Sequence, residues 1–153
     1  MINTVWGSTD KPVASKRLAH ILGAEADLEG TLYIGYPIIG TPEGSFPIDA
    51  LLVSPTKGLV LFSVVEGKAL LDYAETQDEG FNKMQAKLLQ HQTLIRKRKL
   101  LVDIHTITFA PAIAQLQGDD EHPLCNAENL VSTIEEMDDF DLSVFPSLVS
   151  VIQ

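Results

Sequence analysis

The sequence predicts an α/β protein in which a mixed central sheet is flanked by helices. Two apolar runs, residues 48–53 and 59–65, flank a turn at residues 54–58 that holds Pro55 and Gly58. This pattern is typical of a buried β-hairpin. Apolar residues at helical spacing mark one amphipathic helix before the hairpin and a longer one after it.

The segment before the hairpin is predicted to hold a helix and a strand. Residues 1–9 are expected to be a lead-in. Pro12 suits the first turn of a helix and Gly23 suits its end, so a helix is predicted between them with Asp10 or Ser8 as N-cap. Alternating apolar residues then predict a strand over 31–39, and a turn or short loop over 40–45.

The long helix after the hairpin is expected to begin at Asp78 or Asn82 and to run to about Arg98. Residues 70–73 just before it are predicted as a short extension of the sheet. Cations near the C-terminal end, up to Lys99, would complement the helix dipole.

The last third of the chain is predicted to complete the sheet and add short helices. Pro111 ends a strand, and Thr133 is a candidate N-cap for an acidic helix. The predicted elements are a strand over 106–110, a short strand or loop over 124–130, the acidic helix over 134–140, and an amphipathic turn or helix over 143–153.

Composition and length are those of a single domain spanning residues 1–153. The sequence lacks an apolar run of membrane-spanning length and a signal-peptide pattern, so we expect a cytoplasmic protein without a membrane partner. The single cysteine, Cys125, excludes an internal disulfide and is expected to be a small buried hydrophobe. The four histidines lack metal-ligand spacing, which argues against a zinc site.

Charge is unevenly distributed along the chain. Residues 1–99 hold all 11 Lys and Arg and 11 of the 21 Asp and Glu, and so have no net charge. Residues 100–153 hold the other 10 acids and therefore the whole net charge of -10. Any contact with nucleic acid must then use a local basic patch.

One carboxylate lies within the first apolar run of the hairpin. Asp49 stands between Ile48 and Ala50, and an isolated carboxylate is costly to bury without a partner. The pair Ile48-Asp49, followed by the turn from Ser54 to Gly58, resembles the nuclease-related domain (NERD) of the PD-(D/E)XK nuclease-like superfamily. The resemblance implies an α-β-β-β-α-β core.

The family's Glu-x-Lys on the next strand is displaced in this chain. Ser63 lies fourteen residues after Asp49 where the Glu is expected, and Val65 replaces the Lys. Glu66-Gly67-Lys68 follows three residues late, on the opposite face of a regular strand, unless Gly67 marks a bulge. The resemblance therefore implies a degenerate active site in which Asp49, Glu66 and Lys68 are vestigial catalytic residues.

The resemblance implies a non-catalytic accessory domain at the N-terminus of a larger DNA-processing protein, most specifically a superfamily I DNA helicase. Such a domain would need no metal or other cofactor of its own. The first alternative is an active Mg²⁺-dependent nuclease using Asp49, Glu66 and Lys68, with Glu25 or Glu29 as a further ligand. The second is an acidic protein-docking module built on residues 119–121 and 135–141.

Nucleic acid is expected to bind weakly, through cations on the predicted long helix. Along a continuous helix part of this set would recur at near-helical spacing and form a stripe that contacts phosphates. The candidate nucleic-acid-binding residues are Lys83, Lys87, Arg96, Lys97, Arg98 and Lys99.

Overall fold

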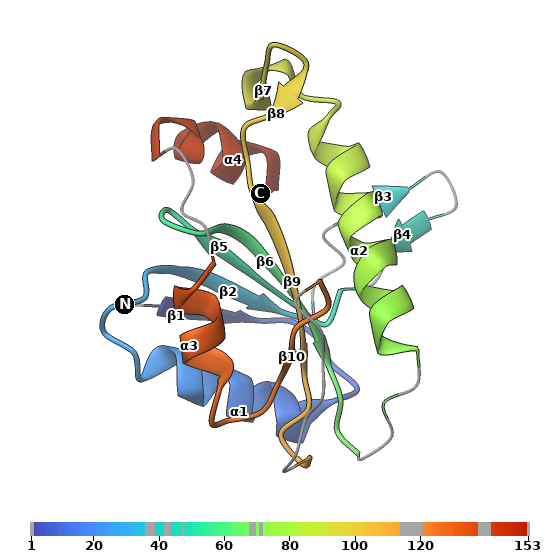
Figure 1. The fold of residues 1–153 in the computed structure, drawn as a ribbon, viewed down its shortest axis with the longest axis vertical. Helices are drawn as coiled ribbons and strands as arrows, with labels where there is room; N and C mark the ends of the chain where they lie inside the picture. The colour runs from blue at the N-terminus through green and yellow to red at the C-terminus, as the bar shows by residue number, and fades with distance from the viewer. Residues whose placement is uncertain are drawn as a thin grey trace.

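The computed structural model describes residues 2–35, 39–41, 44–46, 48–67, 70, 72–113, 121–137 and 142–152, with the backbone alone at 39–41, 44–46 and 142. Its centre is a six-stranded mixed sheet in the order β1-β2-β5-β6-β9-β10 (Figure 1). The strands are β1 (Ile2–Trp6), β2 (Gly30–Ile34), β5 (Ala50–Ser54), β6 (Gly58–Val64), β9 (Ile104–Phe109) and β10 (Leu124–Cys125).

Strand direction divides the sheet into antiparallel and parallel parts. Strands β2, β5 and β6 pair antiparallel, whereas β1 pairs parallel with β2, and β9 pairs parallel with β6 and β10. The predicted α/β class with a mixed sheet and flanking helices is confirmed. The predicted hairpin is also confirmed, with the expected turn joining β5 to β6.

Helices cover both faces of the sheet (Figure 1). One face packs against α1 (Pro12–Gly23) and α3 (Leu130–Glu135), and the other against α2 (Tyr73–Leu88) and α4 (Phe145–Ile152). Side chains alternate along a strand, so each central strand supplies both cores. Leu52 faces α1 while Leu51 faces α2, which explains why β5 is apolar at every position from Ala50 to Val53.

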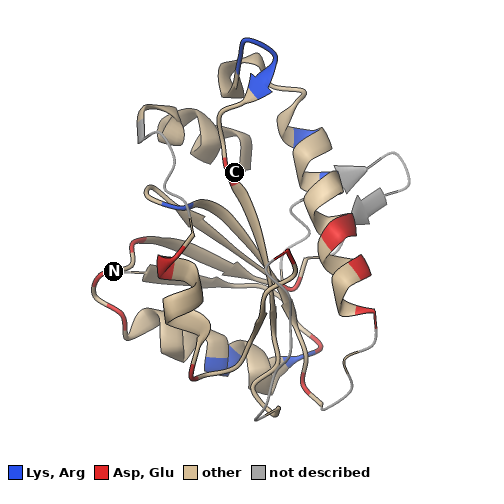
Figure 2. Cartoon of the chain, viewed as in Figure 1, with Lys and Arg blue, Asp and Glu red and all other residues tan. Residues whose placement is uncertain are grey.

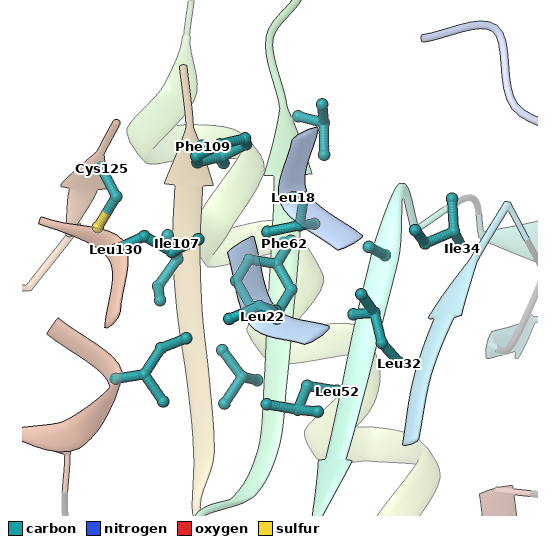
Figure 3. Close-up of a cluster of buried hydrophobic side chains, with 14 of the residues drawn as sticks. Leu18, Leu22, Leu32, Ile34, Leu52, Phe62, Ile107, Phe109, Cys125 and Leu130 are labelled. Atoms are coloured by element: carbon teal, nitrogen blue, oxygen red, sulfur yellow. The ribbon is translucent and has the colours of Figure 1, made fainter. Parts of the chain in front are cut away.

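The core beneath α1 contains Phe62 and Phe109, the two largest fully buried side chains among the described residues. Leu18 and Leu22 of α1 lie over Phe62 of β6 and close to Leu52 of β5 (Figure 3). Cys125 belongs to the same cluster, where burial raises the pKa of its thiol, partly offset by a hydrogen bond to Thr133. The expectation that Cys125 is a buried hydrophobe is confirmed.

Two differences from the predicted elements concern the N-terminal region. Residues 2–6 form the edge strand β1 instead of a lead-in, and only Ile2 in it is buried, which leaves little apolar pattern to detect. Neither Asp10 nor Ser8 caps α1. The N-cap position is Lys11, and the backbone N–H of Ala14 is satisfied by Glu66 Oε1 at 2.9 Å.

The predicted long helix is displaced towards the N-terminus. α2 begins at Tyr73, so residues 72–73 are no extension of the sheet, and it ends at Leu88, well before Arg98. Met84 and Leu88 face the core, but the next positions on that face are the polar His91 and Gln92. The chain instead continues as a 3₁₀ turn, η1 (Gln92–Leu94), and a small hairpin of β7 (Ile95–Arg96) and β8 (Lys99–Leu100).

The remaining elements differ from prediction mainly in their bounds. The loop predicted at 40–45 contains a second small hairpin, β3 (Ile39–Thr41) and β4 (Gly44–Phe46). α3 has Asn129 as its N-cap residue and starts before Thr133, whose hydroxyl donates to Asn129 O at 2.8 Å. Residues 138–140 of the predicted acidic helix lie outside the described residues. η2 (Leu142–Val144) and α4 match the predicted C-terminal helix.

Within the described part of the chain, no helix is both long and apolar enough to cross a membrane.

Candidate functional site

A pocket of about 290 Å³ lies between the hairpin, β9 and α2. Gly80 of α2 and Leu61 of β6 lie close together in its lining, since a Cβ on Gly80 would be 3.4 Å from Leu61 Cδ2. Most of its polar lining comes from side chains far apart in sequence. The lining residues are Lys11, Ile48, Asp49, Leu61, Phe62, Ser63, Thr76, Gln77, Glu79, Gly80 and Thr106.

Asp49 lies directly before β5, where its carboxylate enters the pocket. Its Oδ2 accepts from the backbone N–H of Val64 at 2.8 Å and from Lys11 Nζ at 2.8 Å. These two donors supply the partner that a carboxylate within an apolar run requires. The side chain of Asp49 is 25% exposed and that of Lys11 is 34% exposed, so water screens the ion pair substantially.

Lys11 reaches the site from the start of α1, 38 residues before Asp49 in the chain. The sequence contains no motif that links the two. The α1 helix packs on the opposite face of the sheet from α2. Lys11 stands just before this helix, and its side chain nevertheless lines the pocket beside α2. The positive charge that Asp49 requires is therefore supplied by the chain itself.

The other expected catalytic residues do not join this group. The register that pairs Ala50 with Phe62 places Ser63 opposite Asp49, and Ser63 lines the pocket. Glu66 is not among the lining residues and instead accepts from the N–H of Ala14 in the first turn of α1. Lys68 lies outside the described residues.

The two further metal ligands of the nuclease alternative, Glu25 and Glu29, follow the C-terminal end of α1. The pocket contacts the N-terminal end of that helix, and 12 residues span about 18 Å. Among the described residues, no three His, Cys, Asp or Glu side chains gather as metal ligands. The pocket lining holds two carboxylates, Asp49 and Glu79, and Asp49 Oδ2 is already paired with the Lys11 ammonium, so these side chains fit Mg²⁺ poorly.

Gln77 forms the buried floor of the pocket, and sequence reasoning missed it. Its Nε2 donates to Thr108 Oγ1 at 2.7 Å and to Pro123 O at 3.0 Å, while its Oε1 accepts from Thr106 Oγ1 at 2.9 Å. All three partners lie on or beside β9, so the amide fixes α2 against that strand. A glutamine on an otherwise apolar helix face was the available signal.

The cations expected to form a basic stripe do not lie along one helix. Arg96 to Lys99 lie on the β7–β8 hairpin, and their side chains are all exposed (Figure 2). Lys97 and Arg98 form its turn with φ angles of 52° and 65°. Positive φ at both central residues is the pattern of a type I′ turn, in which Asn-Gly is preferred, and it costs about 1–2 kcal/mol per residue for other side chains.

Replacing Asp49 is expected to cost more than replacing Lys11. Asp49→Ala leaves the N–H of Val64 without its acceptor and should lower the free energy of unfolding by about 2 kcal/mol. Lys11→Met should lower it by less than about 1 kcal/mol, because Asp49 keeps the backbone donor and water reaches it. Urea denaturation of both variants and of the double variant measures these costs and the coupling between them. A larger loss for Lys11→Met would contradict the assigned roles.

Comparisons of the chain with protein-family models, with curated proteins and with solved structures give no significant match.

Proposed function

We propose that the chain is a non-catalytic, nuclease-like accessory domain of a larger DNA-processing protein, specifically a DNA helicase. The observation that carries the proposal is the state of Asp49. A carboxylate that would hold a metal ion in a nuclease is instead paired with the ammonium of Lys11, and Ser63 lies where a second carboxylate is required. The helicase part rests on the family resemblance.

The order of elements supports the nuclease-like part of the proposal. From α1 the chain runs through β2, β5, β6, α2 and β9, which is the α-β-β-β-α-β succession of the PD-(D/E)XK core, apart from the small hairpins. These four strands are neighbours in the sheet, and Asp49 precedes the second of them. This order supports the proposal of a nuclease-like framework in which an internal ion pair replaces the metal chemistry.

Calorimetric titration with Mg²⁺ or Mn²⁺ at millimolar concentration tests the loss of chemistry. We expect no binding heat and no cleavage of plasmid DNA by the wild-type domain. Specific metal binding that Asp49→Ala and Glu66→Gln each abolish would overturn the proposal in favour of the active nuclease.

A gain-of-binding variant gives this experiment a positive reference. Ser63→Asp combined with Lys11→Ala removes the ammonium and places a second carboxylate opposite Asp49. Side chains opposite each other in antiparallel strands have Cβ atoms about 4.5–5.5 Å apart, which suits a shared ion. We expect this variant to bind Mn²⁺ weakly where the wild type does not.

The helicase assignment has its own test. Sequencing the transcript beyond the codon for Gln153 should reveal a continuous reading frame with a Gly-x-x-x-x-Gly-Lys-[Ser/Thr] motif, which the present sequence lacks. A stop codon directly after Gln153 would remove this assignment and leave the test of Asp49 unaffected.

A further inference from the structure

The β7–β8 hairpin carries four consecutive cations at one end of an acidic protein. Arg96, Lys97, Arg98 and Lys99 are all exposed, and the hairpin lies at the end of the molecule, beyond the C-terminal end of α2 (Figures 1 and 2). In the parts of the chain that the structure describes, none of these side chains forms a hydrogen bond or an ion pair. By contrast, Lys11 pairs with Asp49, and Lys57 donates to the carbonyls of Glu135 and Met137 at the end of α3.

The turn of this hairpin is occupied by residues that its backbone does not favour. Lys97 and Arg98 adopt left-handed φ angles, where glycine or asparagine is usual and a long side chain is strained. Residues in strained backbone conformations cluster at functional sites. Turn stability therefore does not favour these two cations, which makes their charge the property that a function could use.

A groove of about 500 Å³ lies between the hairpin and α2. Phe81 and Gln85 of α2 and its C-cap residue Leu89 recur every four residues and form one wall, while Arg98 and Lys99 stand on the other. The floor includes the apolar Val102 and Ile104, and one carboxylate, Asp103, lies at the β9 end beside His105. The groove thus combines an apolar wall, partly exposed at Leu89, with a cationic rim.

Lys83 and Lys87 do not belong to this groove. They lie two residues after Phe81 and Gln85, which turns them about 200° away around the helix. The six cations expected to act together are therefore divided between two surfaces.

We propose that the β7–β8 hairpin and its groove bind single-stranded nucleic acid. Arg96 to Lys99 contact phosphates, and the apolar wall receives unpaired bases, which is how single-strand-binding surfaces combine charge with stacking. The choice of nucleic acid over other polyanions rests on the proposed function. The remaining surface of the net -10 chain repels a polyanion and so restricts it to this one end.

The test measures fluorescence anisotropy of a labelled oligonucleotide across a salt series. The wild type should bind single-stranded DNA with a Kd on the order of 10⁻⁵ M at low salt and bind the duplex more weakly. With four phosphate contacts, the slope of log K against log salt should be no steeper than about −3 for a single strand.

The decisive variant is Lys97→Asn combined with Arg98→Gly. It removes two charges yet installs the preferred type I′ turn, so the thermal midpoint should not fall. We expect affinity at low salt to drop at least about tenfold and the salt slope to halve. The matched control, Lys16→Ala with Arg17→Ala, removes one Lys and one Arg from the exposed face of α1 and should bind like the wild type.

Three results would overturn the proposal. The first is an unchanged salt slope for the hairpin variant, and the second is an equal loss of affinity in the α1 control. The third is tighter binding of polyglutamate than of DNA at the same ionic strength, which would make the partner an acidic polypeptide. Each is distinguishable from failure of the proposed function, which appears as metal binding at Asp49.

Discussion

Replacing Phe62 with alanine is expected to lower the free energy of unfolding by about 3–5 kcal/mol. Phe62 is 1% exposed on the α1 side of β6, where Leu18 and Leu22 close over its ring (Figure 3). The strand is central in the sheet and held on both sides by β5 and β9, so the backbone cannot collapse into the space left by the ring. Urea denaturation should show a lower midpoint with an unchanged m-value.

Two further variants at and near this site set the scale for that result. Phe62→Leu retains most of the buried volume and should cost less than half as much as Phe62→Ala. Val13→Ala, also on α1 but at a position that is 74% exposed, should change the free energy of unfolding by less than about 0.5 kcal/mol. A loss below about 1 kcal/mol for Phe62→Ala would mean that α1 does not pack on β6 as described.

The centre of the sheet was predictable because burial on both faces leaves a direct trace in sequence. A strand covered on both sides is apolar at successive positions, and β5 and β6 each show such a run, separated by Pro55 and Gly58. Edge strand β1 is covered much less. With Ile2 alone buried, its sequence carries almost none of this pattern.

The C-terminal bound of α2 was not predictable from apolar spacing alone. Leu94 and Ile95 were assigned to the helix because their distance from Leu88 roughly fits its period. In the structure Leu94 is buried from a 3₁₀ turn, and the hairpin that follows contains neither Gly nor Asn in its turn. The usual marker of a type I′ turn is absent, so a run of four cations was read as a helix end.

The candidate site was half visible in the sequence. Asp49 could be identified, because a carboxylate within an apolar run demands a partner. Its partner could not be identified, since Lys11 is 38 residues away and joins it only through the fold. The same holds for Gln77, whose three partners lie 29 to 46 residues further along the chain.

Replacing Gln77 with leucine is expected to lower the free energy of unfolding by about 3 kcal/mol. Leucine fills a similar volume but leaves the hydroxyls of Thr106 and the buried Thr108 without their partner, whereas Pro123 O still accepts from the backbone N–H of Thr108. Each buried polar group left without a hydrogen bond costs about 1–3 kcal/mol. Gln85→Leu is the matched control, since Gln85 lies two turns later on α2 at a half-buried position and should change stability by less than about 0.5 kcal/mol.

Gln77→Glu separates the loss of hydrogen bonds from a change of shape. Only a protonated carboxyl can donate to Thr108 Oγ1 or Pro123 O as the amide does, so the fold raises the pKa of this glutamate above its unfolded value of about 4.3. A raised pKa means that the variant is most stable below about pH 4.3 and loses stability, relative to wild type, as the pH rises through the folded pKa. Denaturation of both proteins from pH 4 to pH 8 measures this difference. A difference independent of pH would show that Thr106 and water satisfy the carboxylate, and that the amide of Gln77 does not hold α2 against β9.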